Sequence, residues 1–196
     1  LINEPAVSHY RLATHLGMAL VLFGLMLWMA LSLLRRDGAL TMPAINATFC
    51  LRRHGWTAFA FLCATIIYGA FVAGLDAGLI YNEWPLMGGS FVPSEMGALQ
   101  PFWLNLLENH AAIQFTHRWL AMCTVILVAS FAYRMKSVWL TAAVIGQFLL
   151  GVITLLSQVW VPLGALHQAG AIMLLSVLLW QLHQLHFGQA PQPQQA

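Results

Sequence analysis

Long apolar segments dominate the chain and predict five transmembrane helices. Runs of about 18 or more mainly apolar residues recur, and each can cross a hydrocarbon core about 30 Å thick. The predicted spans cover residues 10–34, 56–79, 112–133, 138–159 and 164–186. The longest connection is the segment 80–111, and a loop of that length seldom serves only as a connection.

Composition supports an all-α polytopic membrane protein. Hydrophobic residues make up 60% of the 196 positions and charged residues only 7%, whereas about 25% of the residues in soluble domains are charged. No nucleic-acid partner is expected. Cys50, Cys63 and Cys123 show neither CxxC nor zinc-type spacing, which argues against a metal cluster and a disulfide framework.

Basic residues cluster on one side of the predicted spans. The clusters are Arg35 and Arg36, Arg52 and Arg53, and Arg134 and Lys136. The positive-inside rule places them on the cytoplasmic or matrix side. The segment 80–111 contains no Lys or Arg and falls outside. The first, third and fifth spans therefore run from outside to inside.

Three histidines lie near the start of the spans that share this direction. His15, His117 and His167 each fall within a turn or two of the outer end of their span, so all three are expected at similar depth. In each case the residue four positions later is alanine. This spacing puts a small side chain one turn below the imidazole on the same helix face. A flat macrocycle ligated by the histidine would need such a gap, which predicts haem-binding helices.

His117 and His167 are the predicted axial ligands of one haem iron. Two neutral imidazoles from facing helices give a six-coordinate, low-spin haem suited to electron transfer. Zinc is less favoured because no carboxylate or thiolate accompanies the pair at that depth. The alternative for any single histidine in a span is structural, in which the ring only hydrogen-bonds a neighbouring helix.

Arginines accompany two of these histidines and have two interpretations. Arg11 precedes His15 by four residues, and Arg118 directly follows His117. A guanidinium at either position would bind a haem propionate in a fork. The alternative is that the long side chain extends to lipid headgroups.

Other polar residues carry simpler expectations. His54, His183 and His186 are expected to be solvated at the inner interface, and His9 and His110 to lie at the outer surface. Gln147, near mid-depth in the fourth span, is expected to hydrogen-bond a neighbouring helix. The outer segment either caps the haem site from the aqueous side or contributes Trp84 and Trp103 to an interfacial aromatic belt.

Several motifs resemble one known family over nearly the whole chain except the tail. They are Tyr-Arg-Leu-Ala-Thr-His-Leu-Gly (10–17), Gly-Ala-Phe-Val-Ala-Gly-Leu-Asp-Ala-Gly (69–78), Tyr-Asn-Glu-Trp-Pro-Leu-Met (81–87), Glu-Asn (108–109), Gln-Phe-Thr-His-Arg (114–118) and Leu-His-Gln (166–168). They resemble haem A synthase, in the form found in α-proteobacteria and mitochondria. The resemblance implies an eight-helix protein made of two similar four-helix bundles, which oxidises a ring methyl of haem O to the formyl group of haem A.

The resemblance also implies roles for individual residues. His117 and His167 match the axial ligands of haem b in the C-terminal bundle. His15, with Arg11 beside it, matches the last helix of the N-terminal bundle, which would hold the substrate haem. The first three helices of the family, and the outer-loop glutamate used in catalysis, have no counterpart here, so the catalytic residue is unassigned.

The expected organisation has three parts. Residues 1–54 are the last helix of an incomplete N-terminal bundle with an inner loop, 55–187 form a four-helix haem b bundle, and 188–196 are a disordered tail. The chain is expected in a bacterial inner membrane, or a mitochondrial one in a eukaryote, and to be inactive alone. Haem O and membrane lipid are expected partners, with haem O synthase and cytochrome oxidase assembly factors as further ones.

Two other functions fit the same residues. One is a b-type cytochrome subunit that only passes electrons to or from a quinol. The other is a non-catalytic haem carrier or assembly factor for a terminal oxidase. Formation of formylated haem would distinguish a haem A synthase from both.

Overall fold

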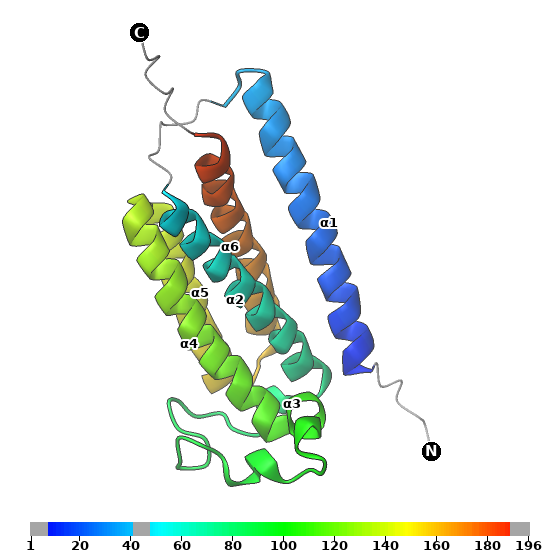
Figure 1. Ribbon diagram of the computed structural model, residues 1–196. Helices are drawn as coiled ribbons and strands as arrows, with labels where there is room; N and C mark the ends of the chain where they lie inside the picture. Colours follow the sequence, from blue (N-terminus) through cyan, green and yellow to red (C-terminus); the bar gives the residue numbers. More distant parts are fainter. Residues whose placement is uncertain (1–7, 41–47, 189–196) are drawn as a thin grey trace.

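A computed structural model describes residues 8–40 and 48–188, and the predicted all-α membrane architecture is confirmed (Figure 1). The long helices are α1 (His9–Arg36), α2 (Phe49–Gly74), α4 (His110–Met135), α5 (Val138–Leu156) and α6 (Val161–Phe187), each long and apolar enough to cross a membrane. The shorter elements are α3 (Asn105–Glu108) and the 3-10 turns η1 (Ala77–Leu79), η2 (Ser94–Gly97) and η3 (Phe102–Leu104). Within the described ranges there is no strand, only one isolated bridge between Met87 and Ser90. The predicted tail beyond Gly188 lies outside the described residues.

The second helix begins earlier and ends earlier than the predicted span 56–79. It begins at Phe49 because the Thr48 hydroxyl accepts a hydrogen bond from the Leu51 N–H at 3.2 Å and caps the helix. It ends at Gly74 because Asp76 adopts a left-handed conformation, with φ of 51°, that a helix cannot continue through. The hydrophobic pattern indicates the apolar stretch, but it does not indicate the residues at which the helix begins and ends.

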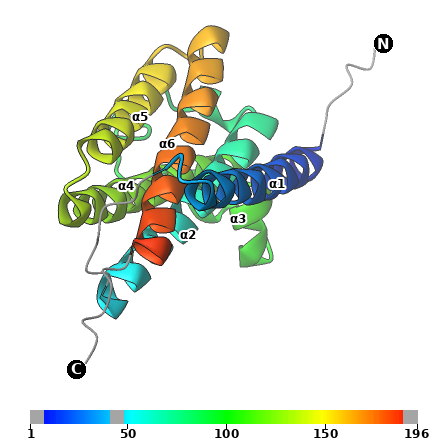
Figure 2. The same ribbon diagram turned by 90° about the horizontal axis from the view of Figure 1, so that it is seen from above.

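Four helices form a ring and the fifth packs against its outside. Adjacent pairs in the ring are α2 with α4, α4 with α5, α5 with α6 and α6 with α2, and α1 contacts α2 and α6 (Figure 2). This arrangement leaves α4 and α6 diagonally opposite each other. In Figure 1, α1, α4 and α6 run in the same direction, as predicted.

The ring is packed more densely in its inner half than in its outer half. The core includes Ala58, Leu62, Val128, Phe131, Leu140, Val144, Leu178 and Leu182. By contrast, no residue of α6 before Leu174 is fully buried, and Thr124 is the only buried residue of α4 between Arg118 and Val128. His167 lies in this part of α6, and His117 directly precedes Arg118 on α4.

The expectation that His183 is solvated is wrong. Its side chain is fully buried, with 0% exposure, because α1 covers this face of α6. The Ser32 hydroxyl donates to the Trp28 carbonyl at 2.8 Å and therefore accepts from His183 Nε2 at 3.0 Å. His54 is half-buried and lies 3.1 Å from the Leu127 carbonyl, while His186 is exposed as expected.

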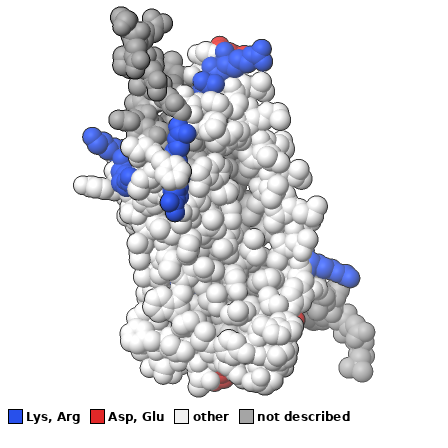
Figure 3. All heavy atoms as spheres, viewed as in Figure 1, with Lys and Arg blue, Asp and Glu red and all other residues white. Residues whose placement is uncertain are grey.

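Charged side chains separate between the two ends of the helices. Most Lys and Arg side chains gather at the end away from the long loop (Figure 3). The loop end contains Asp76, Glu83, Glu95 and Glu108, whereas Asp37 is the one described acid at the other end. This distribution agrees with a loop on the outer side. Orientation in a membrane stays a prediction.

Candidate haem site

His117 is held against α2 by a carbonyl and a glycine. Its Nδ1 lies 3.1 Å from the Thr65 carbonyl oxygen, and its ring lies against Gly69, where an added Cβ would be 3.2 Å from Cε1. A carbonyl can only accept, so this contact keeps the ring proton on Nδ1 and leaves the Nε2 lone pair available for a metal. We call Thr65 and Gly69 the His117 seat.

His167 is held against α5 in a similar way. The Gln147 amide nitrogen lies 3.1 Å from His167 Nδ1 and donates to the His167 carbonyl at 2.8 Å. The ring lies against Gly151, where an added Cβ would be 2.8 Å from Cε1. This confirms the interhelical role expected for Gln147. We call Gln147 and Gly151 the His167 seat.

The two seats repeat one pattern. In each, a polar group is followed four residues later by a glycine, on the helix next to the one that carries the histidine. His117 is the eighth residue of α4 and His167 the seventh of α6, counting from His110 and Val161. The diagonal helices therefore present matched histidines to the same part of the ring.

The residues present fit a haem between these histidines. Six buried side-chain N or O atoms lack a partner in the described part of the chain, and three of them belong to Gln114, Arg118 and Gln147. All three residues lie beside the histidines. Among described residues no group of three or more His, Cys, Asp or Glu side chains could hold a bare metal ion. Haem needs only two protein ligands because its macrocycle supplies the other four nitrogens.

Sequence reasoning missed how room is made for the rings. The alanines four residues after each histidine were expected to leave a gap for the macrocycle, which stays a prediction, whereas the imidazole rings themselves lie directly against glycines of neighbouring helices. Thr65 acts through its main chain, which carries no residue-type signal. The repeated spacing of a polar residue and a glycine was the available signal for Gln147 and Gly151.

Arg118 holds the outer loop in this structure. Its Nη1 donates to the carbonyls of Glu83 and Leu86, both at 3.0 Å, and its Nη2 donates to the Tyr81 carbonyl at 2.9 Å. The guanidinium also lies 5.9 Å from the centre of the Trp84 ring. Binding of a propionate by Arg118 stays a prediction, and both Nη atoms are engaged with the loop.

Replacing Arg118 with methionine is expected to loosen the loop. The variant removes charge-assisted hydrogen bonds to three carbonyls, which should lower the free energy of local opening by about 2 kcal/mol. Amide hydrogen exchange across residues 81–90 should then be roughly 30-fold faster by the same estimate. Arg53→Met, an exposed arginine at the far end, is the control. Unchanged loop exchange in the Arg118 variant would show that the loop is held by other contacts.

The loop carries its own polar contacts at the outer surface. Tyr81 Oη donates to Glu95 Oε2 at 2.6 Å. This hydrogen bond lowers the pKa of Glu95 and raises the pKa of Tyr81. Because the carboxylate is the stabilised form, the contact is present at neutral pH and is lost as the pH falls through the lowered pKa. Trp84 reaches inward to Phe148 on α5, with ring centres 5.7 Å apart, whereas Trp103 is 58% exposed.

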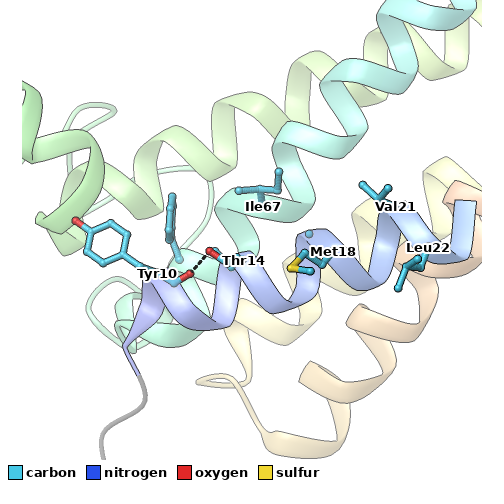
Figure 4. Close-up of a pocket in the computed structure, with 9 residues that line it drawn as sticks. Tyr10, Thr14, Met18, Val21, Leu22 and Ile67 are labelled. Atoms are coloured by element: carbon cyan, nitrogen blue, oxygen red, sulfur yellow. Dashed lines mark hydrogen bonds between the residues drawn. The ribbon is translucent and has the colours of Figure 1, made fainter.

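Arg11 and His15 lie apart from this site. Both are exposed on α1. A groove of about 560 Å³ runs between α1 and α2, lined by Tyr10, Ala13, Thr14, Gly17, Met18, Val21, Leu22, Ile67 and Phe71 (Figure 4). Neither Arg11 nor His15 lines it. The structure therefore places His117 and Arg118 on α4 and His167 on the diagonally opposite α6, and it leaves the two predicted substrate residues exposed on α1.

The expectation for His9 needs correction. It is buried, with its Nε2 3.7 Å from Glu108 Oε2, and Tyr10 Oη donates to the other oxygen of the same carboxylate. These contacts tie the start of α1 to α3 at the outer end. Sequence reasoning placed His9 at the surface because nothing local indicates that Glu108 lies beside it.

Comparison with models of known protein families shows to which family the chain belongs. The model of the COX15-CtaA family, described as cytochrome oxidase assembly protein, matches residues 1–179. The chain belongs to the COX15-CtaA family. Its five apolar helices and this membership identify a multi-pass inner-membrane protein.

Relatives in this family come from bacteria and mitochondria. The chain is 48% identical over 202 residues to a protein of Rhodospirillum centenum named heme A synthase, which covers 97% of this chain and 53% of the relative. It is 40% identical over 192 residues to heme A synthase COX15 of Mus musculus, covering 92% of the chain and 46% of that protein. The chain thus spans about half the length of these relatives. No solved structure matches it.

Proposed function

We propose that this chain is the haem b-binding part of a haem A synthase. The observation that carries the proposal is the pair of matched seats, which hold His117 and His167 on diagonally opposite helices of one ring. The names of the bacterial and mitochondrial relatives supply the activity. The family description adds a place in the assembly of cytochrome oxidase.

The seats assign a binding task to each residue. His117 would hold the iron of haem b through Nε2, because the Thr65 carbonyl on α2 keeps its ring proton on Nδ1. His167 would hold the iron through Nε2 with its Nδ1 directed at the Gln147 side chain on α5. A haem with two imidazole ligands has no open coordination position and supplies one-electron transfer. Arg118 fixes the loop 81–86 at the outer end of α4, where the loop limits access of water.

The substrate haem would occupy a different place. We assign haem O to the face of α1 that carries His15 and Arg11, where the reaction would convert a ring methyl to a formyl group. Both side chains are exposed and make no side-chain hydrogen bond to another described residue. A substrate must be held rigidly, since misplacement by about 1 Å can cost 10²-fold in rate. Haem O synthase and cytochrome oxidase assembly factors are the proposed protein partners.

Pigment analysis tests the proposed activity. The chain is expressed with a haem O supply, either alone or together with the N-terminal half of the Rhodospirillum centenum relative, and haems are extracted and separated by chromatography. We expect haem b in both preparations and formylated haem only in the second. Formylated haem from the chain alone would show that the ring of four helices is itself catalytic. Haem b without formylated haem in either would favour an electron-transferring cytochrome subunit.

A further inference from the structure

Gln147 and His167 interlock α5 and α6 through two glycines. The His167 ring lies against Gly151 of α5, and the Gln147 amide lies against Gly170 of α6, where an added Cβ would overlap Oε1. Each helix therefore lacks a side chain where the other inserts one. This reciprocal fit fixes the position of the amide against the imidazole, so the contact is more than a surface hydrogen bond.

The two histidines differ in what contacts Nδ1. For His117 the partner is the main-chain carbonyl of Thr65, which can only accept. For His167 the partner is the Gln147 side chain, which offers a donor on one atom and an acceptor on the other. In this structure its nitrogen faces both His167 Nδ1 and the His167 carbonyl, and its Oε1 is buried without a partner.

This arrangement places the ring proton of His167 on the wrong atom for iron. If the amide N–H donates to Nδ1, the imidazole proton lies on Nε2. Ligation through Nε2 requires that proton on Nδ1, where it needs an acceptor. Turning the terminal torsion of Gln147 by half a turn exchanges its nitrogen and oxygen, and this torsion is broad and roughly two-fold.

We propose that Gln147 is the positioning residue of His167, and that in the haem-bound protein its Oε1 accepts the Nδ1 proton. The inference rests on the proposed haem site. Turning the amide gives the unpartnered oxygen a donor in the ring and removes the N–H that competes with iron, and it breaks the present hydrogen bond from the Gln147 nitrogen to the His167 carbonyl. Gln147 thereby tunes how strongly His167 donates to the iron, whereas a main-chain carbonyl fixes the corresponding property of His117.

Two variants alter the acceptor in opposite directions. Gln147→Met keeps a similar length but removes the acceptor, so His167 becomes a weaker ligand and the reduction potential of the haem should rise. Gln147→Glu strengthens the acceptor, which favours ferric iron, so the potential should fall. Loss of such a partner typically lowers metal affinity about 10- to 100-fold, and we expect a loss of that size for haem in the methionine variant.

Redox titration of the purified full chain with bound haem is the experiment, with haem affinity measured in parallel. Gln181→Met is the control, because Gln181 is a buried glutamine of the inner half with no hydrogen bond to either histidine. Shifts of opposite sign in the two Gln147 variants, with the control unchanged, support the proposal. Equal reduction potentials in all variants, or shifts of the potential in one direction only, would show that Gln147 only packs against His167. If the unaltered protein lacks six-coordinate low-spin haem, the haem site itself fails, which is a separate result.

Discussion

Replacing either His117 or His167 with alanine is expected to abolish completely the six-coordinate haem proposed for this protein. Each ring is held by its own neighbouring helix, so loss of one leaves iron with a single protein ligand. Among the described residues, the buried His9 and His183 are not placed to substitute, because His9 is engaged with Glu108, and His183 with Ser32, on other faces. The low-spin spectrum of the reduced protein should disappear in both variants.

The controls for this experiment lie on the same helices or at the same depth. His15→Ala and His186→Ala should retain the spectrum, since both residues are exposed and contact neither seat. Imidazole added to the His167→Ala protein should restore part of the signal if the cavity left by the ring admits it. Six-coordinate haem retained in both alanine variants would refute the assignment. Loss in His15→Ala alone would move the site to α1.

Filling the glycine of either seat is expected to displace the histidine it supports. An added Cβ at Gly151 would lie 2.8 Å from His167 Cε1, closer than carbon atoms pack, and at Gly69 it would lie 3.2 Å from His117 Cε1. Overpacking of this kind costs about 1–3 kcal/mol. We therefore expect Gly151→Ala to lose most of its haem, and Gly69→Ala to lose less.

A matched glycine on the same helix separates this effect from helix propensity. Gly146 has nothing within 4 Å of an added Cβ, so Gly146→Ala should keep its full haem content. It should also be slightly more stable, because alanine is favoured over glycine in a helix by about 1 kcal/mol. The three glycine variants are ranked by the amount of haem bound per chain and by thermal stability in detergent. Equal haem content in all three variants would mean that the seats do not constrain the rings.

The membrane architecture could be predicted because its signals are local. Long apolar runs gave the helices, and the common direction of α1, α4 and α6 followed from counting spans. Because these helices share one direction, His117, the eighth residue of α4, and His167, the seventh of α6, lie toward the same end of the ring. The two ends of α2 were predicted less well. Thr48 starts the helix through a hydrogen bond and Asp76 stops it through its backbone conformation, and neither signal is hydrophobic.

The surroundings of the histidines could not be predicted because they depend on which helices are neighbours. The Thr65 carbonyl exists in any sequence, and only the contact of α2 with α4 makes it a partner of His117. The burial of His183 likewise depends on α1 covering α6. The hydrogen bonds from Arg118 to three loop carbonyls could not be predicted either, because the positions of these carbonyls follow from the path of the loop.

One measurement tests the central claim, that a single haem iron is held between His117 and His167. Near-infrared magnetic circular dichroism of the oxidised, purified chain identifies the two axial ligands of low-spin ferric haem from its charge-transfer band. The matched seats predict the band of an iron with two neutral imidazole ligands, from one haem per chain. A band typical of histidine with methionine, or a high-spin spectrum with one axial ligand, would contradict the account.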